Sequence, residues 1–80
     1  MKSGITRDEQ FLLKLYELAG KTGDVHASID RFVIGRAIGQ NDRGSYVIAR
    51  DLARANFVAK GEGDTVHLTA HGLRLVLTLL

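Results

Sequence analysis

The sequence has no cysteine, no proline and no tryptophan among its 80 residues. Without cysteine, neither a disulfide framework nor a thiolate zinc site can stabilise the fold. Stability must come from packing, with or without a partner subunit, because a domain of this size hides only about 60% of the surface that its unfolded chain exposes. The same absence fits a reducing compartment, and we expect a cytoplasmic protein.

Long apolar runs are also missing. The densest run, Leu73 to Leu80, has eight residues and includes Arg74, whereas a membrane-spanning helix needs about 20. At the N-terminus, Met1 to Gly4 lead into charged residues, where a secretory signal would need an apolar core of roughly 7 to 15 residues. With 45% hydrophobic residues and no linker or repeat, we expect one soluble domain covering residues 1–80.

Net charge is small, since 11 basic against 9 acidic residues leave +2. Its distribution is uneven: residues 31–60 contain six basic and two acidic side chains, a net +4, whereas the rest contains five basic and seven acidic, a net −2. A clustered basic segment is the electrostatic footprint of a polyanion-binding face, although an arginine-rich solvated surface gives the same count.

The first predicted helix runs from Thr6 to about Gly20. Thr6 and Glu9 have the spacing of a capping box, in which each side chain satisfies the other residue's backbone donor. Apolar residues then recur at three- and four-residue intervals, which predicts an inward stripe of Phe11, Leu12, Leu15, Tyr16, Leu18 and Ala19.

A short strand over Val25 to Ser28 and a second helix are predicted next. Ser28 or Asp30 is placed to cap this helix. Gly35 lowers its helix propensity by about 1 kcal/mol relative to alanine, and permits close approach of another helix. The apolar positions predicted to face inward are Phe32, Val33, Ala37 and Ile38.

A third helix follows a short polar joint over residues 39–42, and Asn41 or Asp42 is suited to cap it. Its predicted inward stripe is Ser45, Ile48, Ala49 and Leu52, with Ala55 as an optional fifth member. Its predicted outward positions are Arg43, Gly44, Tyr46, Val47, Arg50, Asp51 and Arg54. These are either nucleic-acid contacts or ordinary exposed residues with an Asp51–Arg54 ion pair worth a few tenths of a kcal/mol.

Two alternating segments, Phe57 to Lys60 and Thr65 to Leu68, predict an antiparallel hairpin with a glycine-containing tip at residues 61–64. Glu62 and Asp64 make this tip acidic, so phosphate would repel it. Lys60 is then the obvious contact that the hairpin offers to a polyanion.

The last predicted helix begins at Thr69 as its cap. It is apolar on more than one side, with Leu75 and Leu79 on one and with Leu73, Val76, Leu77 and Leu80 on another. A helix of this kind needs burial on two faces. We expect the second group to form a homodimer interface, the alternatives being that the helix fits wholly inside the monomer or that the sequence is a piece of a longer chain whose continuation covers it.

The order helix, tight joint, helix, hairpin is that of a winged helix-turn-helix, and the motifs point the same way. The run from Ile38 to Leu52, then Ala55 to Val58, with Leu68 to Gly72 afterwards, resembles winged-helix transcriptional regulators. In that family the recognition helix ends in a leucine, a small turn residue and an apolar pair, and a leucine-threonine-x-x-glycine signature follows the wing. The resemblance covers nearly the whole chain, with Asn56 where glycine is common.

The resemblance implies an α+β DNA-binding domain, a three-helix bundle with a hairpin wing and a C-terminal helix, whose third helix enters the major groove. Arg43, Tyr46 and Arg50 are the candidate base contacts, because arginine pairs with a guanine edge and tyrosine offers a hydroxyl and a ring. Phosphate neutralisation is expected from Arg31, Arg36, Arg54 and Lys60. We expect transcriptional control through double-stranded DNA; the alternative is a winged helix used for protein contacts.

Enzyme motifs are not supported. A Gly-Lys-Thr triplet ending at Thr22 resembles the end of a phosphate-binding loop, but Leu15 stands where that motif needs glycine. His67 and His71 have the spacing of zinc ligands on one helix, yet they flank a predicted strand end and helix cap, and no third ligand is evident unless His26 folds nearby. No signature places a nucleophile beside a base. We expect neither catalysis nor a metal or cofactor.

Overall fold

The computed structural model describes residues 5–80. Met1 to Gly4, on which the argument against a secretory signal partly rests, lie outside the described residues. Within residues 5–80 the fold is α+β, with four helices and a three-stranded antiparallel sheet. No helix in that range is both long and apolar enough to cross a membrane. In chain order the elements are α1 (Arg7–Gly20), β1 (Ile29–Asp30), α2 (Arg31–Ala37), α3 (Asp42–Arg54), β2 (Val58–Lys60), β3 (Thr65–Leu68) and α4 (Ala70–Leu79).

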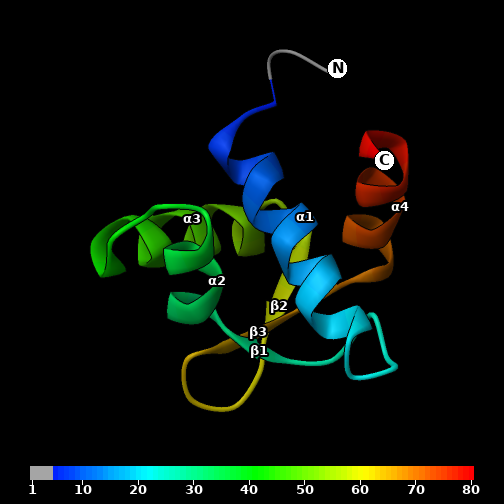
Figure 1. Ribbon diagram of the computed structural model, residues 1–80, viewed down its shortest axis with the longest axis horizontal. Helices are drawn as coiled ribbons and strands as arrows, with labels where there is room; N and C mark the ends of the chain where they lie inside the picture. The colour runs from blue at the N-terminus through cyan, green and yellow to red at the C-terminus, as the bar shows by residue number, and fades with distance from the viewer. Residues whose placement is uncertain (1–4) are drawn as a thin grey trace.

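Helix α1 lies across the middle of the molecule, with α2 and α3 on one side and α4 on the other (Figure 1). The predicted capping box is confirmed: Thr6 Oγ1 accepts from the backbone of Glu9 at 3.1 Å, and Glu9 Oε1 accepts from the backbone of Thr6 at 2.9 Å. Its inward stripe is confirmed as well. Four of its residues are buried completely: Phe11, Leu12, Leu15 and Ala19.

The sheet has the order β1-β3-β2, with Ile29 opposite Val66 and with Val58 opposite Leu68. The predicted strand over Val25 to Ser28 is wrong, because β1 starts one residue later and has two residues. Residues 24–27 form a turn instead. The Asp24 side chain accepts from the backbone of His26 at 2.9 Å, and the Asp24 carbonyl accepts from Ala27 at 2.9 Å, so local Asx bonding replaces strand pairing there.

Helix α2 begins after Asp30, whose side chain accepts from Phe32 N at 2.8 Å. The stripe predicted for it is wrong in part. Ile34 and Gly35 are buried, whereas Val33 is 49% exposed and Ala37 is exposed. Gly35 faces α3, where an added Cβ would overlap Ser45, and Val33 and Ala37, four residues apart, lie together on the outward side.

The junction between β3 and α4 explains the leucine-threonine-x-x-glycine motif. Leu68 is buried in the core, and Thr69 Oγ1 donates to the Asn56 carbonyl at 2.7 Å while accepting from Gly72 N at 3.0 Å. A Cβ at Gly72 would collide with the Phe57 carbonyl oxygen, so the close contact requires glycine. Asn56 has φ +68°, the left-handed conformation that asparagine tolerates. The motif thus ties α4 to the chain that leaves α3.

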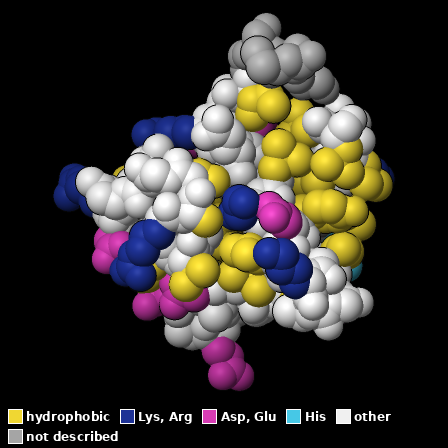
Figure 2. All heavy atoms as spheres, viewed as in Figure 1, with side chains coloured by type: hydrophobic (Ala, Val, Ile, Leu, Met, Phe, Trp, Pro, Cys, Tyr) yellow, Lys and Arg dark blue, Asp and Glu magenta, His cyan; other side chains and the backbone are white. Residues whose placement is uncertain are grey.

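Helix α4 divides its apolar residues between the core and the surface. Val76 is completely buried, which contradicts its predicted place in a dimer interface, and Leu73 packs against the core. Leu77 and Leu80 remain 55% and 71% exposed. Hydrophobic side chains gather on the side of the molecule where α4 lies (Figure 2). Gly72 and Val76 lie four residues apart and face inward together, and Leu77, the residue after Val76, points to another side. Leu80 lies beyond the last helical residue, Leu79.

Candidate nucleic-acid interface

The corner between α2 and α3 is tight. The amide of Gln40 donates to the Gly35 carbonyl at 2.9 Å, and Gly39 takes φ +83°, which allows the chain to reverse within a few residues. A Cβ on Gly35 would overlap the Ser45 side chain, so the predicted close approach of two helices at this glycine is confirmed. Ser45 is fully buried, and its hydroxyl donates to the Asn41 carbonyl at 2.8 Å. The corner therefore holds α3 in one orientation against α2.

Helix α3 begins as predicted at Asn41, whose side chain accepts from Gly44 N at 2.8 Å. The predicted inward stripe is confirmed except for Ala55, which is exposed because the helix ends at Arg54 and Ala55 is its cap. Four larger side chains are exposed on the opposite side, at intervals of three and four residues: Arg43, Tyr46, Arg50 and Arg54. We call these four residues the outer face of α3. Intervals of three and four residues place these side chains along one line of the helix.

Ion pairs restrain part of the basic surface. Arg50 pairs with Asp51 at 3.3 Å, so the predicted Asp51–Arg54 pair is wrong. Arg36 reaches Asp42 at 3.1 Å, with both side chains about 60% exposed. Exposed pairs of this kind contribute roughly 0 to 1 kcal/mol and exchange readily with other anions. Arg43 and Arg54 have no ion-pair partner within residues 5–80.

Arg31 differs from the exposed phosphate contact that was predicted. Its side chain is only 15% exposed, and Nη2 donates to Asp64 Oδ1 at 2.9 Å. Its backbone amide also donates to the Asp64 carbonyl at 2.9 Å. The guanidinium lies 5.0 Å from the centre of the Phe32 ring and 5.2 Å from that of Tyr46, within cation–π range. Arg31 therefore joins α2, α3 and the tip of the β2–β3 hairpin.

This contact also changes the electrostatics of the hairpin tip. Asp64 is one of the two carboxylates expected to repel phosphate there, and its charge is paired with Arg31. Glu62 is exposed. Among residues 5–80 the tip thus presents one negative charge without an ion-pair partner where two were predicted, with Lys60 exposed at the end of β2.

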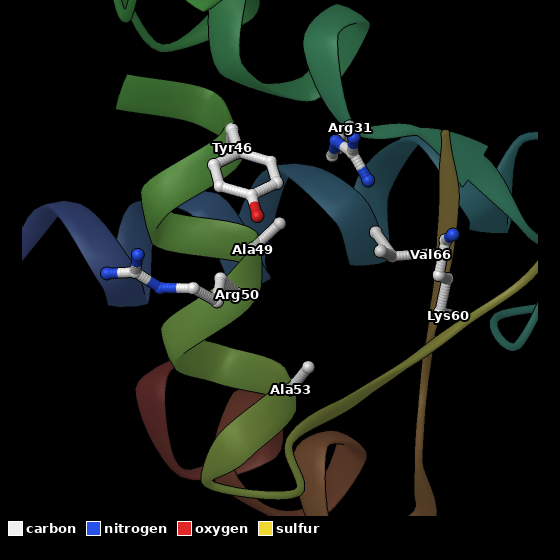
Figure 3. A pocket seen from close by; sticks show the side chains of 7 residues that line it. All are labelled: Arg31, Tyr46, Ala49, Arg50, Ala53, Lys60 and Val66. Atoms are coloured by element: carbon white, nitrogen blue, oxygen red, sulfur yellow. The ribbon is translucent and has the colours of Figure 1, made fainter. Parts of the chain in front are cut away.

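A pocket of about 250 Å³ lies between α3 and the sheet. We call it the α3–hairpin pocket. In Figure 3, Tyr46 and two alanines lie along the α3 side of the pocket, Arg31 and Lys60 lie on the opposite side, and the Arg50 guanidinium turns away. No carboxylate is among the residues that line it, which are Arg31, Tyr46, Ala49, Arg50, Ala53, Lys60 and Val66.

The pocket was missed from the sequence because Arg31 and Lys60 are 29 positions apart and come from different elements. The local signal was weak: Ala49 and Ala53 lie one turn apart on α3, and their small side chains leave room beside the sheet. Only the packing of α2 and the hairpin against α3 brings Arg31 and Lys60 to the same opening.

Other polar residues lie outside this region. A second, shallower hollow on α1 and α2 includes Lys14 and Glu17, and the 2.7 Å hydrogen bond from Lys14, with its positive charge, lowers the pKa of Glu17. His26 Nδ1 lies 2.7 Å from the Leu68 carbonyl oxygen, and His71 stacks on Phe57 with ring centres 4.6 Å apart. Among the described residues, no group of three or more histidine or acidic side chains is placed to hold a metal ion.

The chain matches no protein-family model, no curated protein and no solved structure.

Proposed function

We propose that this chain is a winged helix-turn-helix domain that binds double-stranded DNA, with α3 in the major groove, and that it acts in transcriptional control. The observation that carries the proposal is the outer face of α3, a line of exposed arginines and one tyrosine on a helix whose other side is buried. The tight corner with α2 supports it, because a recognition helix must be held rigidly to present side chains to base edges.

The dimensions suit this role. Helix α3 has 13 residues, and such a helix is about 20 Å long and fits a major groove roughly 12 Å wide. Arg43 and Arg50 would reach guanine edges or phosphates, and Tyr46 a phosphate or a thymine methyl group. Breaking the exposed Arg50–Asp51 pair takes little free energy, so this pair does not prevent Arg50 from binding DNA.

Phosphate neutralisation would come from residues around this helix. Arg54 lies at the end of α3 with no ion-pair partner among residues 5–80, Arg36 lies on α2 within reach of Asp42 at the start of α3, and Lys60 is exposed at the end of β2. Together with Arg43 they offer four cations to the backbone, and Arg50 and Arg31 would raise the number to six. The β2–β3 hairpin takes the position of the wing, and the pairing of Asp64 with Arg31 reduces its repulsion of phosphate.

A salt titration tests the proposal. We expect a fluorescein-labelled random duplex to bind with an affinity that falls steeply with KCl, with a log–log slope of roughly −4 to −5, as four to six phosphate contacts require. The ¹⁵N-labelled domain should show amide shifts concentrated in residues 41–54 when the duplex is added. A slope near zero, or shifts confined to residues 70–80, would instead favour a winged helix used for protein contacts.

We also propose that the domain forms a homodimer through the exposed part of α4. Leu77 and Leu80 form an apolar surface beyond what the core uses. A two-fold axis near α4 would present two copies of α3 to one duplex, and DNA-binding dimers place such helices about 34 Å apart. Leu73 would lie at the edge of this interface, and Val76 takes no part because it is buried in the core.

A further inference from the structure

We propose that the α3–hairpin pocket holds one backbone phosphate of the DNA, bound by Arg31, Lys60 and the Tyr46 hydroxyl. The inference rests on the function proposed above and assigns a defined phosphate site to it. It gives Arg31 a role different from that of the exposed arginines: a single preorganised contact at the junction of three elements.

The charge of the pocket selects an anion. Arg31 and Lys60 line one side, and no carboxylate is among the lining residues. The rest of the wall is largely apolar, formed by Ala49, Ala53 and the buried Val66. An apolar wall lowers the local dielectric, so Lys60, together with the part of the Arg31 charge that Asp64 does not balance, attracts an anion more strongly here than on an open surface.

Arg31 also has an unused donor at this site. Within residues 5–80, Arg31 Nε is the one buried side-chain nitrogen or oxygen without a hydrogen-bond partner. Arginine carries five N–H donors, and the bond to Asp64 uses one of those on Nη2. Buried donors are nearly always paired in proteins, so Arg31 keeps a donor that no group in residues 5–80 satisfies, and a small shift of its side chain would offer this donor to an oxygen from outside the chain. The rings of Phe32 and Tyr46 hold the guanidinium in place beforehand.

The position of the pocket selects a backbone phosphate. Tyr46 and Arg50 belong both to the pocket lining and to the outer face of α3. A DNA strand that follows this face therefore passes over the opening. A phosphodiester has two unesterified oxygens, one for the guanidinium of Arg31 and one for the ammonium of Lys60, and the tyrosine hydroxyl can donate to either.

The first test closes the pocket without changing charge. Ala53→Leu places a larger side chain in the lining, and Ala55→Leu, two residues further on and exposed outside the pocket, is its matched control. We expect Ala53→Leu to weaken duplex binding roughly tenfold, as loss of a charged hydrogen-bonded contact does, and to reduce the steepness of the salt slope by about 1. Ala55→Leu should change neither quantity. Should Ala53→Leu fail to fold, Lys60→Gln provides the same two readouts from an exposed position.

The second test observes the donor directly. In ¹H–¹⁵N spectra of the whole chain, the Arg31 Nε–H signal should move when duplex is added, and should stay in place in Ala53→Leu. Inorganic phosphate at matched ionic strength separates the two sources of the group. If free phosphate moves this signal and duplex does not, the pocket is a free-phosphate site and the inference is wrong.

The outcomes separate the inference from the function on which it rests. If the wild-type chain binds duplex with a steep salt slope while Ala53→Leu and Lys60→Gln bind as well as Ala55→Leu, the DNA-binding function stands and the phosphate site is overturned. If the wild-type chain does not bind duplex at all, both are overturned. A tenfold loss with a shallower slope, together with the duplex-dependent Arg31 signal, supports both.

Discussion

Helices α3 and α4 lie in two regions of the molecule and differ in the kind of side chain that they leave exposed. Helix α3 buries one stripe, including Ile48 and Leu52, and exposes arginines on the other side. Helix α4 buries Val76 and still exposes Leu77 and Leu80. Basic side chains are spread over the side of α2 and α3 in Figure 2, with acidic ones among them, whereas hydrophobic ones gather on the side of α4. This difference is the basis of the two proposed contacts, a polyanion for one region and an apolar surface for the other.

The largest effect is expected at the corner that fixes α3. Gly35→Ala would press a methyl group into Ser45, so we expect the free energy of unfolding to fall by about 1 to 3 kcal/mol or more. Gly20→Ala is the matched control, because nothing lies within 4 Å of its added Cβ, and it should raise stability by up to about 1 kcal/mol. Urea denaturation followed by circular dichroism measures both. Equal effects of the two changes would mean that the α2–α3 corner is not closely packed.

The next effect concerns the charge of the two regions. Arg50→Ala on the outer face of α3 should weaken duplex binding by about 1 to 3 kcal/mol if Arg50 reads a base, which is roughly 5- to 150-fold. Arg74→Ala removes the same charge from the exposed side of α4 and should leave affinity nearly unchanged. Fluorescence anisotropy at one fixed salt concentration gives both values. Equal losses would indicate diffuse attraction by net charge, with no dedicated DNA-binding face.

The smallest effect concerns the apolar region. Replacing both Leu77 and Leu80 by alanine should weaken self-association by about tenfold or more, as truncation of a central apolar contact does. Stability should change little, because both side chains are mostly exposed. Val33→Ala removes a similarly exposed apolar side chain from α2 and serves as the control. Sedimentation equilibrium over a range of concentrations measures the dimer constant. A wild-type chain that stays monomeric at millimolar concentration would contradict the proposed dimer.

Most expectations based on short-range signals are confirmed, the strand over Val25 to Ser28 and the Asp51–Arg54 pair excepted. The capping box of Thr6 and Glu9, the Asn41 cap and the hairpin over residues 58–68 all depend on bonds between residues close in the sequence. The stripe of α3 was also readable, because its polar and apolar sides alternate with the helical period. Asn56 stands where glycine is common in the family that the sequence resembles, and it adopts the left-handed conformation.

Expectations that depended on a helix's neighbours were less successful. The seven residues of α2 are apolar on most sides, so their pattern did not predict which side faces inward. The close contact of Gly35 with Ser45 identifies that side. In α4 the same ambiguity placed Val76 at a surface when it belongs to the core. Arg31 was counted among exposed cations because its pairing with Asp64, 33 positions away, leaves no trace in local pattern.

The sequence by itself determined where the helices and the hairpin begin and end and which side of α3 is polar, because caps, glycine turns and helical periodicity act over a few residues. Tertiary structure alone decided the orientation of α2, the division of α4 between core and surface, and the α3–hairpin pocket. These depend on which side chains from distant segments meet, as Arg31, Tyr46 and Lys60 do. Local conformational preferences do not specify which side chains of distant segments come into contact. Close packing of the whole chain does.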